Sequence, residues 1–447
     1  NAQSAQMSEL EQLKAQLQAL QQKVEALEQQ QSVKDTAAQE QAAKLEALQK
    51  QATATEAAAE HATDAVAQTR TGLPEWVSRF QWKGDFRYRN EDIKQEFAPE
   101  RDRDRIRARF GFAAKVNDTV RTEMQLTTGE SLSNGGYGDA RSSNQTLTDA
   151  NSRKRIWLDT AFAEWAPNAN WKFTLGKMRY PYYRPTTSLF FDSDINPEGA
   201  AVNWQQGADG VFASAFYFDL TERATTTDST LSGAQVGWRG DVASGMRLTV
   251  AASYFDNGAV EGWNAVQDAT LPGNAFGNTT TTSTAVCRTG VLTATNTACI
   301  ANDFNIVEAL AELSMQVGGR PLIFAVDYAK NNKADFSPTG SGLDTAYNAG
   351  IQYGKVAAAH TWEVGYLYQK VENDALYGQF FDSDFAGGTT GSKGHVFKIG
   401  YGFGKNFRIN GTYFLNDTNI DVPVTIGGVP ITDRHYRRLQ IDLNVGF

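Results

Sequence analysis

The chain has 447 residues, among them 51 acidic and 42 basic side chains, and its net charge at pH 7 is −9. It is rich in glycine and aromatic residues, yet its mean hydropathy is negative. No apolar run reaches the roughly 20 residues that a membrane-spanning helix needs, so a bundle of such helices is excluded. A closed barrel agrees with this composition, because its backbone amides are all paired and alternate side chains can stay polar.

Residues 1–70 predict an α-helical coiled coil. They contain no Gly, Pro, Phe, Tyr or Trp and are dominated by Ala, Gln, Glu, Leu and Lys, which is a helical composition. Apolar residues recur at alternating spacings of three and four, the seam of a helix that pairs with other helices rather than with a core. The predicted oligomerisation residues are Leu10, Leu13, Leu17, Leu20, Val24 and Leu27. A lone solvated helix is the alternative, and residues 71–78, with Gly72 and Pro74, form a linker.

From Phe80 the apolar period changes to two, which predicts an all-β fold: a 16-stranded antiparallel transmembrane β-barrel over residues 79–447. The last strand shows the pattern most clearly, since apolar residues alternate with polar or small ones from Leu439 to the terminal Phe447. The predicted strands lie near 79–89, 104–116, 119–128, 154–165, 171–179, 200–206, 209–219, 232–240, 245–256, 304–317, 320–330, 344–354, 358–370, 393–403, 406–416 and 434–447.

The predicted connections alternate in length. Seven short turns, such as 117–118, 354–356 and 405–406, separate eight long loops, such as 90–103, 180–199 and 257–303. Short turns belong to the periplasmic side of outer-membrane barrels, so both ends of the barrel and the coiled coil are expected there. The chain starts at Asn1 without an initiator Met or an apolar signal region, as expected of a mature secreted form.

Two patterns concern covalent and metal sites. Cys287 and Cys299 lie twelve residues apart in a Thr- and Gly-rich loop, which favours a disulfide in an oxidising compartment over a metal site or two free thiols. Residues 192–198 place acidic or amide side chains at positions 1, 3, 5 and 7 of a calcium-loop register. Pro197 and Asn203 occupy positions that need Gly and Glu, so we expect an acidic turn facing basic residues, with no metal and no cofactor.

Four segments carry a resemblance to a known family: RIRARFGF at 105–112, WLD at 157–159, LGKMRYPYYR at 175–184 and FDSDINPEG at 191–199. On these segments the chain resembles the Gram-negative family of putative porins. A heptad helix before a sixteen-stranded barrel is also similar to the layout of phosphate-selective and dicarboxylate-type trimeric porins. The resemblance implies a homotrimer, a third loop folded inward near 180–199, and a preference for anionic solutes. The chain departs from the phosphate-selective pattern in lacking an arginine ladder along that loop.

Basic residues at lumen-facing positions gather on the first strands and on the last strand, which closure places beside the first. Arginine can donate two parallel hydrogen bonds to a carboxylate or phosphate, so these residues predict a lumen that attracts anions. We expect partial pairing with lumen acids that leaves a positive field; the candidate acids are Asp85, Glu123, Asp159, Glu308, Glu312 and Glu363. The predicted pore and solute-binding residues are Lys83, Arg87, Arg89, Arg105, Arg107, Arg109, Arg121, Lys177, Arg179, Tyr182, Tyr183, Arg184, Arg434 and Arg438. The third-loop residues among them face the pore only if that loop folds inward as the resemblance implies.

We therefore expect a porin of the Gram-negative outer membrane, a passive diffusion channel for small anionic solutes such as dicarboxylates or inorganic anions. Its expected partners are two further copies of the chain, outer-membrane lipid and lipopolysaccharide. The alternative is a structural protein whose helical stalk tethers the membrane to peptidoglycan. No nucleophile-elbow, zinc-protease or phosphate-loop motif indicates an enzyme. Nucleic-acid binding is not expected, because the basic residues alternate with lipid-facing aromatics.

Overall fold

The structure is a computed structural model that describes residues 75–131, 137–148, 150–264, 275–292, 298–340 and 342–447. The predicted coiled-coil residues, from Leu10 to Leu27, lie outside these ranges. The chain divides into two compact units, Asn1–Ser78 and Arg79–Phe447. In the first unit the described residues form helix α2 (Glu75–Ser78), within the predicted linker. Across the described ranges, no helix is long and apolar enough to cross a membrane.

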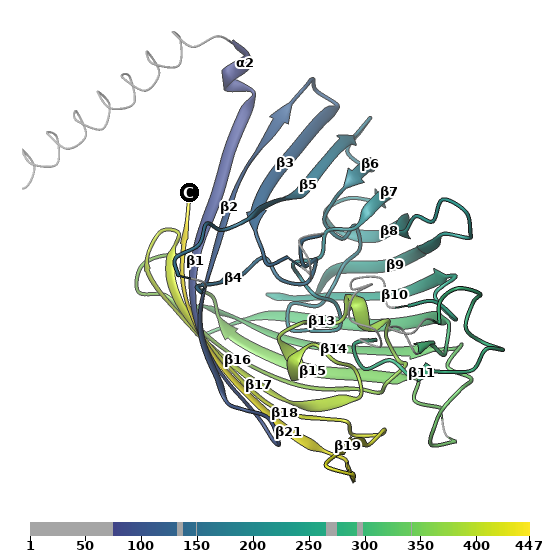
Figure 1. The fold of residues 1–447 in the computed structure, drawn as a ribbon. Coiled ribbons are helices and arrows are strands. Elements are labelled where there is room, and N and C mark those ends of the chain that lie inside the picture. The colour runs from purple at the N-terminus through teal and green to yellow at the C-terminus, as the bar shows by residue number, and fades with distance from the viewer. Residues whose placement is uncertain (1–74, 132–136, 149, 265–274, 293–297, 341) are drawn as a thin grey trace, which may run out of the picture. The chain divides into compact units, whose positions relative to one another are not determined.

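The second unit is a closed antiparallel β-barrel of 16 long strands (Figure 1). Each strand pairs with the next along the chain, and the last pairs with the first, from Asp85 opposite Gly446 to Gln95 opposite Tyr436. In Figure 1 the yellow C-terminal strand accordingly lies beside the purple N-terminal one. The strands are β1 (Phe80–Gln95), β2 (Arg101–Lys115), β3 (Val120–Thr128), β5 (Ile156–Trp165), β6 (Trp171–Lys177), β7 (Glu198–Gln205), β8 (Gly210–Thr221), β9 (Ser229–Ala243), β10 (Met246–Gly258), β13 (Phe304–Val317), β14 (Arg320–Asn331), β15 (Thr345–Gly354), β16 (Trp362–Val371), β17 (Ser392–Gly404), β18 (Phe407–Thr418) and β21 (Arg434–Gly446).

All the predicted strands are confirmed, and β13 has the predicted bounds. Several connections differ in length from the prediction, and two of them bear on the lining of the barrel. Strand β1 continues to Gln95 and β2 already begins at Arg101, so the first loop spans 96–100 rather than 90–103. Strand β16 begins at Trp362, four residues later than predicted, which makes the turn before it longer.

That turn, residues 355–361, lies against the inner face of β17. The His360 N–H donates to the carbonyl oxygen of Gly402 (2.8 Å), and the Gly402 N–H donates to the carbonyl oxygen of Thr361 (2.9 Å). Gly402 belongs to the inward-facing set of β17, and a Cβ atom there would lie 2.2 Å from the carbonyl oxygen of Ala358. The missing side chain at Gly402 therefore leaves the room that the turn occupies.

Short elements lie in the longer connections. They are β4 (Gln145–Thr146), which pairs with β2, the pair β11 (Thr280–Thr281) and β12 (Cys299–Ile300), the pair β19 (Val424–Ile426) and β20 (Val429–Ile431), and the 3-10 helices η1 (Gly378–Phe380) and η2 (Phe385–Gly387).

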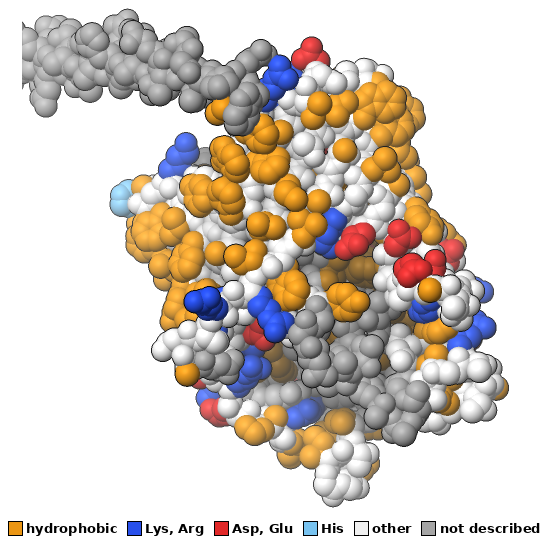
Figure 2. All heavy atoms as spheres, turned by 45° about the horizontal axis from the view of Figure 1, so that its top comes forward, with side chains coloured by type: hydrophobic (Ala, Val, Ile, Leu, Met, Phe, Trp, Pro, Cys, Tyr) orange, Lys and Arg blue, Asp and Glu red, His pale blue; other side chains and the backbone are white. Residues whose placement is uncertain are grey.

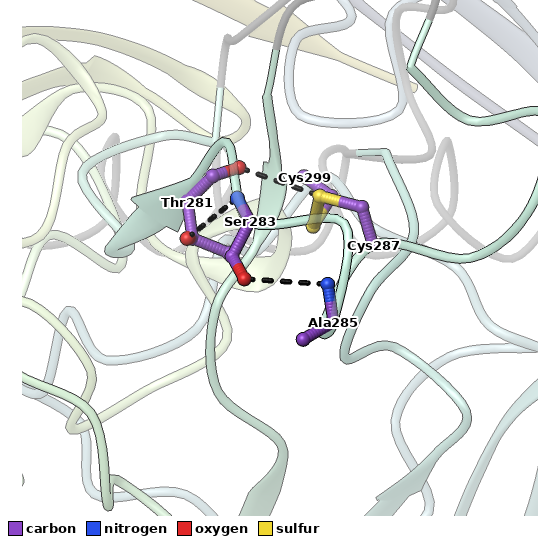
Figure 3. The surroundings of a disulfide bond; sticks show 5 residues. All are labelled: Thr281, Ser283, Ala285, Cys287 and Cys299. Atoms are coloured by element: carbon purple, nitrogen blue, oxygen red, sulfur yellow. Dashed lines mark hydrogen bonds between the residues drawn. A yellow bond between two sulfur atoms is a disulfide. The ribbon is translucent and has the colours of Figure 1, made fainter.

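Cys287 and Cys299 form a disulfide in the connection between β10 and β13 (Figure 3). Their Cα atoms are 5.7 Å apart, and both residues are buried. Thr281 of β11 lies beside the bond, with its carbonyl oxygen 3.4 Å from the Sγ atom of Cys287. The disulfide and the β11–β12 pairing thus hold the same part of this connection together.

Side chains alternate between the two faces of the barrel wall, as a barrel in lipid requires. On β2, Phe110 is 50% exposed on the outer face, whereas Arg107 is 6% exposed on the inner face. Figure 2 shows hydrophobic side chains over much of the visible face of the barrel. The outer face therefore suits hydrocarbon, and the inner face of β1, β2 and β21 is polar and charged.

The inner face is not polar everywhere. Inward aromatic side chains of β8, β10 and β13, namely Phe218, Phe255 and Phe304, are at most 2% exposed. They share one apolar cluster with Phe190, which follows β6, and Phe381, which follows β16. Connecting segments therefore fill part of the barrel interior with a packed core.

The seam between β1 and β21 can be tested at Gly84. The backbones of Gly84 and Phe447 exchange two hydrogen bonds of 3.0 and 3.2 Å, and a Cβ atom at Gly84 would lie 2.3 Å from the Phe447 ring. We expect Gly84→Val to displace this ring and to lower the stability of the barrel by about 1–3 kcal/mol, the usual cost of overpacking. The effect is measured as the temperature at which the compact form is lost on electrophoresis.

Gly404→Ala is the matched control, because a Cβ atom there meets no atom within 4 Å. Equal unfolding midpoints for Gly84→Val and the parent chain would contradict this account of the seam.

Candidate pore and its lining

Strand register brings inward basic residues of β1, β2 and β21 together. Arg87 lies opposite Arg107, and Arg89 opposite Arg105, in the β1–β2 pair. Their spacing of two keeps all of them on the inner face. We call the following residues the basic wall: Arg87, Arg89, Arg103, Arg105, Arg107, Arg109 and Arg438. Like charges directly opposite one another destabilise a sheet, so this wall requires acidic partners.

Glu91 is the central partner of the basic wall. Its side chain is fully buried, and its carboxylate lies 2.6 Å from Arg103 and 2.6 Å from Arg438. Arg105 lies 3.6 Å from the same carboxylate. With Arg89, which lies 3.5 Å away, four guanidinium groups share one buried acid, and their pairing compensates the cost of removing that charge from water.

Two further carboxylates pair with arginines of the wall. Asp442 of β21 accepts two hydrogen bonds from Arg89, of 2.6 and 2.8 Å, in a bidentate arrangement. Asp85 of β1 accepts from the Nε atoms of both Arg107 (2.9 Å) and Arg109 (2.6 Å). These pairs fix the guanidinium planes against the barrel wall.

The two loop acids Asp194 and Asp384 and the acid Glu130 complete the set. Seven arginines therefore face six carboxylates, which leaves one positive charge among the paired groups. Sequence reasoning missed Glu91, because the first strand was expected to end before it. It also missed Asp384, which lies 295 residues from its partner Arg89.

Of the predicted acids, Asp85 and Glu123 pair with basic pore residues. The other four were wrong as partners of the basic residues: among the described residues Asp159 accepts from Gln125 and Asn196, Glu308 from Ser253, Glu312 from the N–H of Thr186, and Glu363 from the N–H of Val356. These carboxylates bind uncharged donors, some of them from connecting segments that lie inside the barrel.

Lys83 and Arg179 form a second basic group on the inner face. Both lie 2.5 Å from the carboxylate of Glu123 on β3. The Glu123 side chain is only 4% exposed, whereas Lys83 is 34% and Arg179 51% exposed. The cations therefore stand between the carboxylate and the solvent.

The connection between β6 and β7, residues 178–197, crosses the inner face of distant strands. The Tyr183 N–H donates to Gln235 of β9 (2.8 Å), and the Ser188 hydroxyl donates to Asp327 of β14 (2.8 Å). Further along, the Leu189 N–H donates to Gln369 of β16 (3.3 Å). Inward polar side chains thus accept hydrogen bonds that this irregular backbone needs inside a barrel.

The predicted residues of this segment have different surroundings. Tyr182 is 7% exposed and packs against Phe216 and Phe255, with ring centroids 5.0 and 5.1 Å away, so it is a packing residue rather than a pore residue. Arg184 lies 4.6 Å above the Tyr180 ring and donates to a backbone carbonyl. Tyr183 is half-buried beside its Gln235 contact.

Three predicted residues lie near the barrel ends. Lys177 shares the outward parity of Leu175 and pairs with Glu198 (2.9 Å), so it does not line the pore. Arg121 faces inward and lies 3.7 Å from Glu164. Arg434 is located at the opposite end of the wall, where it donates to a backbone carbonyl.

The segment after β6 also contacts the segment after β16, residues 372–391. The Asp192 N–H donates to the carbonyl oxygen of Phe380 (2.8 Å), and the Ser383 N–H donates to the Asp192 carboxylate (2.8 Å). Burial, with the nearby Asp382, raises the pKa of Asp192 well above its ordinary value. Burial, with the neighbouring Asp384, raises the pKa of Asp382 to about 6. We call this contact the loop seam.

We expect the loop seam to weaken as the pH rises. Its carboxyl groups hold protons more tightly than in an open loop, where the pKa is 3.8, so the stability they contribute is present at acid pH and is lost as the pH rises through about 6. Asp194, Tyr180 and Arg141 also face Asp192 and keep their charges or protons over this range. Single-channel recordings should show larger and more frequent current fluctuations at pH 8 than at pH 5.

Asp192→Asn combined with Asp382→Asn keeps the hydrogen-bond acceptors and removes both titrating charges, so the recordings of this variant should be much less sensitive to pH. Identical pH dependence in this variant and in the parent chain would refute the role of the seam.

Comparisons with known proteins identify the family. A family model described as "Putative porin" matches residues 94–447. OmpT of Vibrio cholerae, in its in-vitro folded trimer form, is 13% identical, with 82% of this chain and 99% of that chain covered and a TM-score of 0.43. A triple mutant of the Rhodopseudomonas blastica porin is 11% identical over 82% of this chain and 99% of that chain, with a TM-score of 0.43. Salmonella typhi OmpF in complex with daunomycin is 10% identical over 82% of this chain and 97% of that chain, with a TM-score of 0.45.

No curated protein matches the chain. The family model nevertheless covers most of the barrel and includes the basic residues of β2, the segment after β6 and the closing strand. This match and the closed barrel with its apolar outer face agree with one another. The chain belongs to the Putative porin family, whose members are outer-membrane channels.

Proposed function

We propose that this outer-membrane channel conducts small solutes by passive diffusion and favours anions such as dicarboxylates or inorganic oxyanions. One observation carries the proposal: at the two most deeply buried of the paired inner-face carboxylates, Glu123 and Glu91, every paired cation is more exposed than the acid. Lys83 and Arg179 are exposed while Glu123 is buried, and Arg103 is 15% exposed while Glu91 is fully buried. At these two carboxylates a solute in the lumen therefore meets positive charge first, although the charges nearly balance in number along the basic wall.

The segment after β6 contributes to this preference. It brings Arg179 to the inner face and occupies part of the barrel interior, so it narrows the path that a solute takes. A narrow path of low dielectric constant strengthens the field of the groups that line it.

Reversal potentials in a KCl gradient test the anion preference. We expect Lys83→Gln with Arg179→Gln to lower the chloride-to-potassium permeability ratio about threefold, since two exposed cations together contribute roughly 0.6 kcal/mol at this level of screening. A third substitution, Glu123→Gln, removes the carboxylate left without partners, so it separates a folding defect from a change in selectivity.

Arg247→Gln is the matched control. Arg247 has a similar exposed fraction, 41%, and pairs with Asp209 and Asp241 at a short turn, away from Glu123. A parent channel without anion preference, or a double variant that keeps the parent's reversal potential, would contradict the proposal.

We further propose that the channel is a homotrimer in the outer membrane, among lipid and lipopolysaccharide, with residues 1–70 as a periplasmic coiled coil. The heptad seam from Leu10 to Leu27 supports this. Leu13→Asp with Leu20→Asp puts unpaired charge into the seam, so the trimer should dissociate in mild detergent. Light scattering measures the oligomer mass, and an unchanged mass would contradict a role of the coil in assembly.

The tethering function remains the second candidate, supported by the length of the heptad segment, about 100 Å if residues 1–70 are fully helical. Sedimentation with peptidoglycan separates the two candidates. The full chain should sediment and a chain lacking residues 1–70 should not, if the stalk is a tether.

A further inference from the structure

A cavity of about 330 Å³ lies on the inner face of the barrel at the end that carries the short turns. In outer-membrane barrels this end faces the periplasm. The strands β1, β2, β18 and β21 form its wall, and the infolded turn 355–361 contributes Val356 and Ala357. The polar lining residues are Asp85, Arg107, Arg109, Asn406, Arg408 and Asn444. Arg408 is absent from the predicted pore residues, although its position two residues before the inward-facing Asn410 gives it lumen parity.

Strand register explains how the cavity arises. Arg408 of β18 lies opposite Asn444 of β21, and Asp85 of β1 lies opposite Gly446, two residues further along β21. Gly446 is on the inward-facing side of β21, where it has no side chain to fill the space between Asp85 and Asn406. The cavity is therefore a gap in the wall, flanked by arginines.

The arginines of the cavity differ in how far they are neutralised. Arg107 has two acidic partners, Asp85 at 2.7 Å and Asp194 at 4.0 Å. Arg109 shares Asp85 through its Nε atom and makes no other ion pair with the described residues. Arg408 is exposed and makes no ion pair or side-chain hydrogen bond with any residue in the described ranges.

Positive charge therefore exceeds negative charge at this cavity, even when both acids are counted. The two guanidinium groups of Arg109 and Arg408 also retain free N–H edges. Such an edge donates two parallel hydrogen bonds to a pair of oxygen atoms on one carbon, sulfur or phosphorus centre. A spherical halide meets both N–H groups at a single centre, so its two hydrogen bonds converge and are bent rather than parallel.

We propose that this cavity binds a small oxyanion, a carboxylate or an inorganic oxyanion, at the periplasmic mouth of the channel. The proposal rests on the proposed anion preference, and it adds a site that binds the solute transiently before the solute leaves the channel. Arg408 and the free edge of Arg109 hold the paired oxygens, and Val356 and Ala357 close the opposite side. Charge attracts the anion, and the two parallel hydrogen bonds discriminate it from chloride.

Calorimetric titration of the full-length protein in detergent tests the site, with sodium acetate, sodium sulfate and sodium chloride as probes. Acetate and chloride carry the same charge, so only the paired oxygens distinguish them. We expect acetate or sulfate to bind, and Arg408→Gln to weaken that binding roughly tenfold through loss of one bidentate contact. Lys405→Gln is the matched control, because it removes one positive charge from the adjacent turn without altering the cavity lining.

The outcomes separate the two proposals. Binding of acetate alone or of sulfate alone supports the site and identifies its solute as organic or inorganic. Binding that is unchanged in Arg408→Gln, equally weakened in Lys405→Gln, or equal for acetate and chloride overturns it. If the channel shows no anion preference in reversal potentials but acetate binding depends on Arg408, the proposed selectivity fails and the site stands. If Arg408→Gln gives the same compact form on electrophoresis as the parent chain, the variant folds.

Discussion

The pairing of β21 with β1 is the constraint on which the rest of the barrel depends. An open edge in hydrocarbon would leave backbone N–H and C=O groups without partners, at a cost of several kcal/mol each. The pairing of β1 with β21 removes that edge, and it runs from Asp85 opposite Gly446 to Gln95 opposite Tyr436. The same register carries Arg438 and Asp442 to the inner face beside Arg89, so closing the sheet also assembles the charged wall.

The closure of the sheet explains why the arginines of the basic wall pair with so many carboxylates. Arginines that face one another across β1 and β2 repel, and the inner face offers only limited access to water. The fully buried Glu91 offsets this repulsion, because its carboxylate pairs with four of the arginines. Removing one member of such a network would leave an uncompensated buried charge, which typically costs 3–5 kcal/mol. The field that a solute experiences is therefore set by which groups are exposed and only weakly by the number of each charge.

The strands could be predicted because lipid enforces their alternation. Where lipid no longer does so, the prediction fails: the end of β1, from Asn90 to Gln95, has Ile93 as its single apolar residue, so no period of two is visible there. The inward position of the β2 arginines could be predicted from the alternation of side chains along the strand alone. Lys177 could have been excluded in the same way, since it shares the parity of Leu175.

The loop partners could not be predicted. Asp384 pairs with Arg89 and Arg438 from a connection without periodicity, and no local pattern points to a contact so distant in sequence. The same holds for the turn 355–361, whose inward position depends on a glycine in another strand. Packing between separate elements decides these positions, and only the folded chain contains that information.

The apolar side chains that fill the barrel interior also affect the behaviour of the chain before it inserts into the membrane. Strand β8 carries Phe212, Phe216 and Phe218 inward and Val211 and Tyr217 outward, so neither of its faces is polar. Before insertion, a segment of this kind lies in water with nothing to cover it, and short uncharged stretches rich in aromatic and β-branched residues are those that associate with one another. Strands β1 and β2 carry arginines on one face, and the repulsion between these charges opposes the association of such segments with one another. Before the barrel forms, β8 therefore has less charge than β1 or β2 to prevent its association with other chains.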